Sequence, residues 1–158
     1  MPGNNMERMI QLAEDFFGTR NDSTQISVNE EVLNRLRQIH SHTLNEKRND
    51  DGPVAWILIV PTTAELMKRF IDGKINESEL LSMTSIGVAY ETIYLCSALV
   101  LPEFRGKGIA KQLTIEAVER IRKDHSIQSL FVWQFSSEGE KLADTVAKAV
   151  ELPLYKRG

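Results

Sequence analysis

Two glycines and three cations stand close together in the stretch LPEFRGKGIAKQL. Arg105 and Lys107 alternate with Gly106 and Gly108, and Lys111 follows shortly after, between an apolar run and a helical pattern. The first amides of a helix have no partner inside the helix, and they lie at the positive end of its dipole. Glycines let a bulky anion approach such amides closely, and the cations add full charges. The stretch therefore predicts a phosphate-binding turn.

Two common phosphate-binding motifs do not match this turn. The Walker A motif requires Gly-Lys followed by Ser or Thr, whereas Ile109 and Ala110 come after the Gly-Lys-Gly sequence here. The dinucleotide-binding fingerprint requires a third glycine, and Lys111 occupies that position. Neither motif therefore describes this turn.

The elements around the turn predict an α/β fold: one domain over residues 1–158, with a mixed central β-sheet flanked by helices. Polar loops are expected at 18–29 and 45–53. The apolar periodicity predicts helices near 6–17, 30–46, 62–70, 77–83, 106–123 and 137–149, and strands near 54–60, 91–101, 129–135 and 152–157.

The turn resembles motif A of the GNAT superfamily of N-acetyltransferases, written R/Q-x-x-G-x-G/A. Arg105 to Ala110 match every position, and VLPEF at 100–104 is similar to the family's V-x-P-E-[YF] lead-in. The resemblance covers about 91–157, where a strand, a helix and a final strand follow the motif as in the family. It implies a GNAT-like C-terminal half joined to an atypical helical N-terminal half.

The resemblance implies acetyl-CoA as co-substrate, with its pyrophosphate on the amides of residues 105–110. It also implies that a backbone amide of the preceding strand binds the thioester oxygen, since a developing oxyanion requires a donor. Ser137 would be a capping residue first and a cofactor contact second. The implied cofactor-binding residues are Ala98, Leu99, Val100, Arg105, Gly106, Lys107, Gly108, Ile109, Ala110 and Ser137.

The catalytic candidates are Tyr94 and Glu91. Some family members carry a glutamate base where this chain has Tyr94, whose hydroxyl suits an acid that protonates the leaving thiolate. Glu91 is the only carboxylate on that strand and is the candidate base. The alternatives are a core aromatic for Tyr94 and a solvated strand-start residue for Glu91. The tyrosine that many family members use as acid near the end of the last helix is replaced by Thr145.

Composition narrows the function classes. The net charge of −3 argues against nucleic acid as partner, and the single cysteine, Cys96, suggests a buried inert thiol and no metal site. No stretch is long and apolar enough for a membrane span, so a cytoplasmic location is expected.

The predicted function is an acetyl-CoA-dependent N-acetyltransferase acting on a small-molecule or peptide amine, and this interpretation allows a homodimer. The alternatives are a catalytically inactive CoA-binding module and an anion or nucleic-acid binding module.

Overall fold

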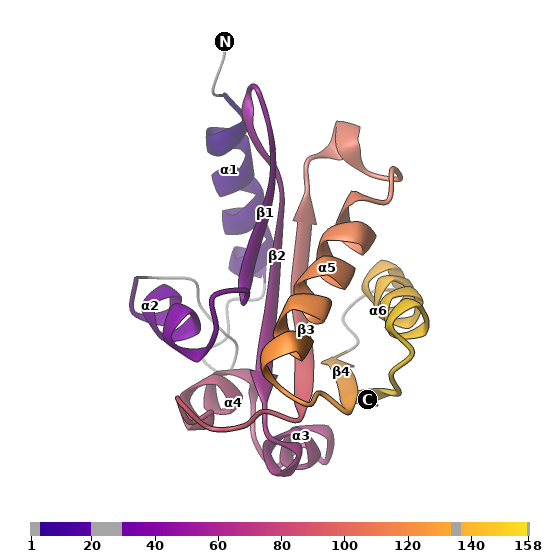
Figure 1. Ribbon diagram of the computed structural model, residues 1–158. Coiled ribbons are helices and arrows are strands. Elements are labelled where there is room, and N and C mark those ends of the chain that lie inside the picture. Colours follow the sequence, from indigo (N-terminus) through magenta and orange to yellow (C-terminus); the bar gives the residue numbers. More distant parts are fainter. Residues whose placement is uncertain (1–3, 20–29, 134–136, 158) are drawn as a thin grey trace.

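The computed structural model describes residues 4–19, 30–133 and 137–157 of the 158-residue chain (Figure 1). None of the helices in this part of the chain is long and apolar enough to cross a membrane. The helices are α1 (Asn4–Thr19), α2 (Glu30–Ile39), α3 (Ala64–Ile71), α4 (Glu77–Met83), the short 3-10 helix η1 (Pro102–Phe104), α5 (Ile109–Asp124) and α6 (Ser137–Val150). The strands are β1 (Leu44–Asn49), β2 (Gly52–Thr62), β3 (Thr92–Val100), β4 (Ser129–Trp133) and β5 (Leu154–Arg157).

The strands form one mixed sheet in the order β1-β2-β3-β4-β5. The first three strands pair antiparallel, and β3, β4 and β5 pair parallel. Parallel neighbours need a crossover connection, which α5 and α6 provide. The predicted α/β class, with a mixed sheet flanked by helices, is confirmed.

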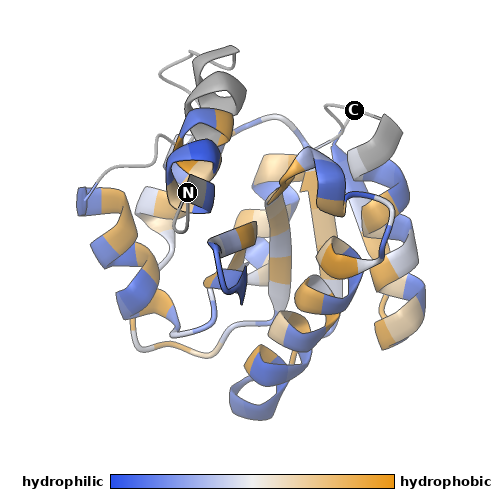
Figure 2. Ribbon diagram, turned by 90° about the horizontal axis from the view of Figure 1, so that it is seen from above, coloured by the Kyte–Doolittle hydropathy of each residue, from blue (hydrophilic) through white to orange (hydrophobic). Residues whose placement is uncertain are grey.

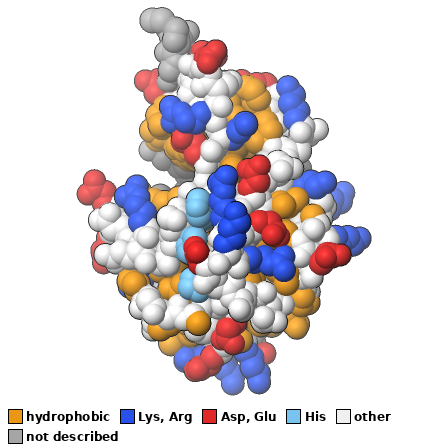
Figure 3. Space-filling view, viewed as in Figure 1, with side chains coloured by type: hydrophobic (Ala, Val, Ile, Leu, Met, Phe, Trp, Pro, Cys, Tyr) orange, Lys and Arg blue, Asp and Glu red, His pale blue; other side chains and the backbone are white. Residues whose placement is uncertain are grey.

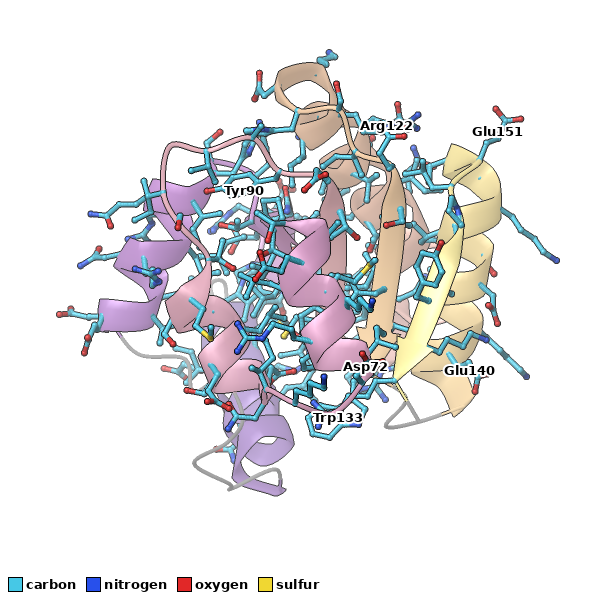
Figure 4. The ribbon with its side chains drawn as sticks, turned by 90° about the horizontal axis from the view of Figure 1, so that it is seen from below. Asp72, Tyr90, Arg122, Trp133, Glu140 and Glu151 are labelled. Atoms are coloured by element: carbon cyan, nitrogen blue, oxygen red, sulfur yellow. The ribbon has the colours of Figure 1, made fainter. Side chains whose placement is uncertain are left out.

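Helices cover both faces of the sheet. In Figures 1 and 2, α5 and α6 lie over one face of the sheet and α1 lies behind the other. The helices α5 and α6 also contact each other, since Arg122 Nη1 donates to the Val150 carbonyl at 2.9 Å (Figure 4). On the opposite face, the ring of Phe70 on α3 packs against Tyr94 and Phe131. Figure 2 shows the apolar strands enclosed between helices whose outer sides are polar.

The region 30–53 differs from the prediction. The predicted helix near 30–46 ends at Ile39, and the predicted loop at 45–53 is largely the hairpin of β1 and β2. The hydroxyl of Thr43 donates to the carbonyls of Leu36 and His40, at 3.0 and 3.1 Å, and so closes the helix early. The sequence of β1, LNEKRN, is mostly polar and exposed, so its conformation depends on pairing with β2.

Other predicted elements are confirmed. The two short helices between the second and third strands are α3 and α4, each begun by a side-chain cap, from Thr63 and Asn76 respectively. The C-terminal strand is β5, at the edge of the sheet as expected. The last two positions of the predicted strand 129–135 lie outside the described residues.

A histidine cluster joins the end of α5 to the α2–β1 connection. His40 Nε2 lies 2.7 Å from Asp124 Oδ2, and its Nδ1 accepts the amide hydrogen of His42 at 3.0 Å. The ring of His125 lies 5.9 Å from that of His40 and 4.7 Å from that of Tyr90, measured between ring centroids. Figure 3 shows histidine side chains gathered on this face. The three histidines of the chain therefore share one site.

This cluster makes stability depend on pH. Burial lowers the pKa of His42, helped by the charges of Arg120 and His40 and opposed by Asp124. Burial also lowers the pKa of His125, helped by His40 and opposed by Asp124. The unfolded chain therefore binds these protons more readily than the folded chain does. We expect the folded state to lose stability as pH falls below about 6.5.

Thermal unfolding between about pH 7.5 and 5.5 measures this effect, because ordinary carboxylates stay ionised over that range. The unfolding temperature should decline with pH, and the double variant His42→Gln, His125→Gln should flatten the decline. An equally steep decline in the double variant would contradict the assignment.

Candidate functional site

The turn between β3 and α5 has the backbone that its glycines predict. Gly106 and Gly108 lie in the left-handed region, with φ of +76° and +79°. Residues with a side chain rarely adopt this backbone conformation. Gly108 precedes α5, and its carbonyl accepts the first helical bond, from Gln112 N at 2.9 Å. The earlier amides of α5 therefore have no acceptor within the helix. Nothing lies within 4 Å of a Cβ built on either glycine, so the turn is open to a ligand.

The three cations of the turn are exposed but differ in position. Arg105 Nε donates to the Val100 carbonyl at 2.9 Å, which ties the turn to the end of β3. Lys107 Nζ lies 5.5 Å from the ring centroid of Phe104. Arg105 and Lys111 line the cavity described below, whereas Lys107 is not among its lining residues. The structure therefore places two of the three cations at the cavity.

The strand β3, the central strand of the sheet, carries a bulge near its own middle. Ile59 pairs with Leu95 and Leu58 pairs with Ser97, so Cys96 is the extra residue. The pairing of β3 with β4 covers only Thr92–Tyr94 against Ser129–Phe131. Beyond that point, toward the glycine turn, the two strands separate. The separation opens the sheet beside the turn.

A cavity of about 760 Å³ fills this opening, within the range of about 300–1,000 Å³ typical of ligand sites. Its wall is largely apolar and comes from β2, β3, β4, the turn, α5, α6 and Leu12 of α1. Trp133 lines it where β4 ends, and in Figure 4 this residue lies beside the end of α3, as its ring contact with Phe70 requires. The cavity thus runs from the anion-binding turn into the gap between β3 and β4.

Most of the predicted cofactor-binding residues meet at this cavity. The exceptions are Lys107, described above, and Ser137, whose side chain lies outside the described residues. The predicted residues that line the cavity are Ala98, Leu99, Val100, Arg105, Gly106, Gly108, Ile109 and Ala110. Their role in binding stays a prediction.

The two predicted catalytic residues do not line the cavity. Glu91 precedes β3 at the end away from the turn, where its carboxylate accepts from the Ala64 amide at 3.2 Å and supports the start of α3. Tyr94 is buried, with 1% of its surface exposed, and its ring stacks on Phe131 at a centroid distance of 5.0 Å. Neither side chain is positioned to contact a ligand in the cavity directly, so their catalytic roles remain predictions without support from their positions.

Sequence reasoning missed Glu77. This α4 carboxylate is fully buried, and its Oε2 accepts from the hydroxyl of Tyr94 at 2.5 Å and from Cys96 Sγ at 3.8 Å. Cys96, expected to be buried, is only half-buried and lines the cavity. A glutamate is almost never fully buried unless it is paired, and nothing in the sequence indicated this burial.

The helix α1 is fixed to the turn region. Arg8 makes two bonds of 2.6 Å to the carboxylate of Glu103, and this pairing lowers the pKa of Glu103 to about 2. Met9 packs with Leu99 in a small apolar cluster on the same side. The N-terminal helix therefore contributes a wall of the cavity through Leu12.

The described residues contain no group of three or more His, Cys, Asp or Glu side chains placed to hold a metal ion.

A search among curated proteins found no match. A family model described as the acetyltransferase (GNAT) family matches residues 6–141. That match begins well before residue 91, where the resemblance was expected to start, and so includes α1 and the β1–β2 hairpin. The glycine turn, the split sheet and this match over most of the chain agree: the chain belongs to the acetyltransferase (GNAT) family.

Proposed function

We propose that the chain transfers an acetyl group from acetyl-CoA to a primary amine of a small molecule or peptide. Membership of the family supports acyl transfer in general. The observation that carries the finer proposal is the cavity, which runs from the open glycine turn at Gly106 and Gly108 to the bulge at Cys96. A ligand with a pyrophosphate at one end and an apolar arm ending in a thioester fits this combination.

Different parts of the cavity would bind different parts of acetyl-CoA. The free amides at the start of α5, with Arg105 and Lys111 beside them, would hold the pyrophosphate. The apolar wall along β3 and α6 would hold the arm and exclude water, which strengthens polar interactions with the reacting atoms. Where β3 leaves β4, backbone amides of β3 are released from that pairing and are available to the thioester oxygen.

A second candidate is a CoA-binding module without catalysis. One observation favours it: no Asp, Glu, His or Tyr is among the described residues that line the cavity. An anion or nucleic-acid binding module is less well supported, because only two of the turn's cations face the cavity and the rest of its wall is largely apolar.

Two measurements separate these functions. Calorimetric titration with acetyl-CoA, with inorganic pyrophosphate as comparison, tests CoA binding. Binding of pyrophosphate alone with equal affinity would favour the anion module. Thiol release from acetyl-CoA across a panel of amines then tests transfer, and tight binding without release above the uncatalysed rate would favour the inactive module.

The cations of the turn should contribute unequally to acetyl-CoA affinity. Arg105→Ala should weaken binding more than Lys107→Ala, since Arg105 both lines the cavity and holds the Val100 carbonyl, while Lys107 lies over Phe104. The loss should shrink at high salt, where exposed charges are screened. Titrations at low and high salt check this. Equal affinities of both variants and the parent at low salt would show that these cations take no part.

A further inference from the structure

No ordinary proton acceptor is among the described residues that line the cavity. An amine with an ordinary pKa of about 10.4 must lose a proton before or during its attack on a thioester. The described residues lining the cavity include no carboxylate, imidazole or phenol, and its polar side chains are Cys96, Ser97, Thr114, Arg105, Lys111 and the indole of Trp133. Among the described residues, a proton acceptor is therefore sought behind one of the walls of the cavity.

Glu77 is a carboxylate that lies behind the wall formed by β3 at Cys96. It is fully buried, although burying a carboxylate costs free energy unless it is hydrogen-bonded. Two residues of β3 donate to its Oε2: Tyr94 from the paired part of the strand, and Cys96 from the bulge. Of these two donors, only Cys96 lines the cavity. A single thiol therefore separates the cavity from a buried carboxylate.

We propose that Glu77 accepts the proton of the acceptor amine through the thiol of Cys96. This inference rests on the proposed function. One proton of the ammonium group moves to Cys96 Sγ while the thiol's own proton moves to Glu77 Oε2, and the freed amine nitrogen then bonds to the thioester carbon. As the carbon–sulfur bond breaks, a second proton of the nitrogen passes to the sulfur of CoA, and the proton held by Glu77 leaves through Cys96 to water. The ammonium group and acyl-CoA become an amide, free CoA and one proton, and both side chains end as they began.

The rate test uses variants that keep the shape of the site. Glu77→Gln keeps an oxygen acceptor for Tyr94 but cannot take the proton. Near neutral pH it should lose on the order of 100- to 10,000-fold in thiol release, the range of one acid–base group. The loss should fade at high pH, where the amine is already free. Cys96→Ala should show the same profile, and Cys96→Ser, whose hydroxyl can also pass a proton, should lose less.

Two further carboxylate variants serve as comparisons. Glu65→Gln makes the same chemical change at an exposed position of α3 and should keep the parental rate. Glu91→Gln tests the base expected from the sequence: if it, and not Glu77→Gln, gives the loss that depends on pH, the relay is overturned. Acetyl-CoA affinity should stay parental in Glu77→Gln. Parental rates in both Glu77→Gln and Cys96→Ala across the pH range would also overturn the relay.

Alkylation of Cys96 tests the contact independently of turnover. A neighbouring carboxylate opposes formation of the thiolate, so Glu77→Gln should shift the alkylation rate of Cys96 toward lower pH. Acetyl-CoA should protect the thiol if it occupies the cavity. An unchanged alkylation profile would overturn the relay, while failure of acetyl-CoA to bind in calorimetry would overturn the proposed function. The two failures are thus distinguished.

Discussion

Gly108→Glu should abolish acetyl-CoA binding while the fold remains intact. Gly108 stands directly before α5, where the first amides are open, and it lines the cavity. A glutamate there would fill the phosphate position and place a negative charge beside a pyrophosphate. We expect affinity to fall at least about 100-fold, equivalent to ~2.7 kcal/mol. Calorimetric titration measures the loss, and circular dichroism checks that the fold is kept.

Gly73→Glu provides the matched control. Gly73 follows α3 and has a φ of +76°, close to the +79° of Gly108, and the space around both is open. Both variants therefore carry the same added charge and a similar left-handed strain, of roughly 1–2 kcal/mol. Only Gly108 lies at the cavity, so Gly73→Glu should bind like the parent. Equal affinity in the two variants would show that the ligand does not approach the turn.

The order of elements around the turn could be predicted from the sequence because its signals are local. Apolar runs indicated β2, β3 and β4, and the glycines with their cations indicated the turn before α5. The strand β1 was missed because its residues are mostly polar. Its conformation comes from pairing with β2, which lies later in the chain. Local propensity cannot report such a partner.

The catalytic candidates show a different limit of prediction from the sequence. Glu91 was a candidate because it is the only carboxylate on the predicted strand, yet a strand rises about 3.3 Å per residue, which puts it about 30 Å from Val100. The strand length alone therefore argued against it. Tyr94 was expected to reach a ligand, but helices α3 and α4 bury it. Glu77 gained its position through the same packing, which joins residues 17 apart in the sequence.

The packing of α3 against the sheet leads to the second prediction with a large effect, which is on the stability of the fold. Phe70 is fully buried on α3, with ring centroids 5.1 Å from Tyr94, 5.7 Å from Phe131 and 5.9 Å from Trp133. The guanidinium carbon of Arg157 lies 4.6 Å from its centroid. Tyr94 and Phe131 are the last paired residues before β3 and β4 separate. Phe70 therefore supports the sheet at the inner end of the cavity.

Phe70→Ala should destabilise the fold by about 3–5 kcal/mol, since it leaves a large void among rings that cannot close it. For a chain of this size the unfolding temperature should fall by roughly 6–20 °C. Urea unfolding measures the free energy. Ile86→Ala, at a site that is 46% exposed, is the control and should change stability by less than about 0.5 kcal/mol.

The same variant tests whether α3 also shapes the ligand site. If the Tyr94–Phe131 pair fixes where the strands separate, Phe70→Ala should weaken acetyl-CoA binding under conditions where the variant is still folded. Lost stability with parental affinity would show that α3 supports the sheet without shaping the cavity. A free energy of unfolding equal to the parent's would contradict the packing of Phe70 itself, because a fully buried ring cannot be removed without loss of its contacts.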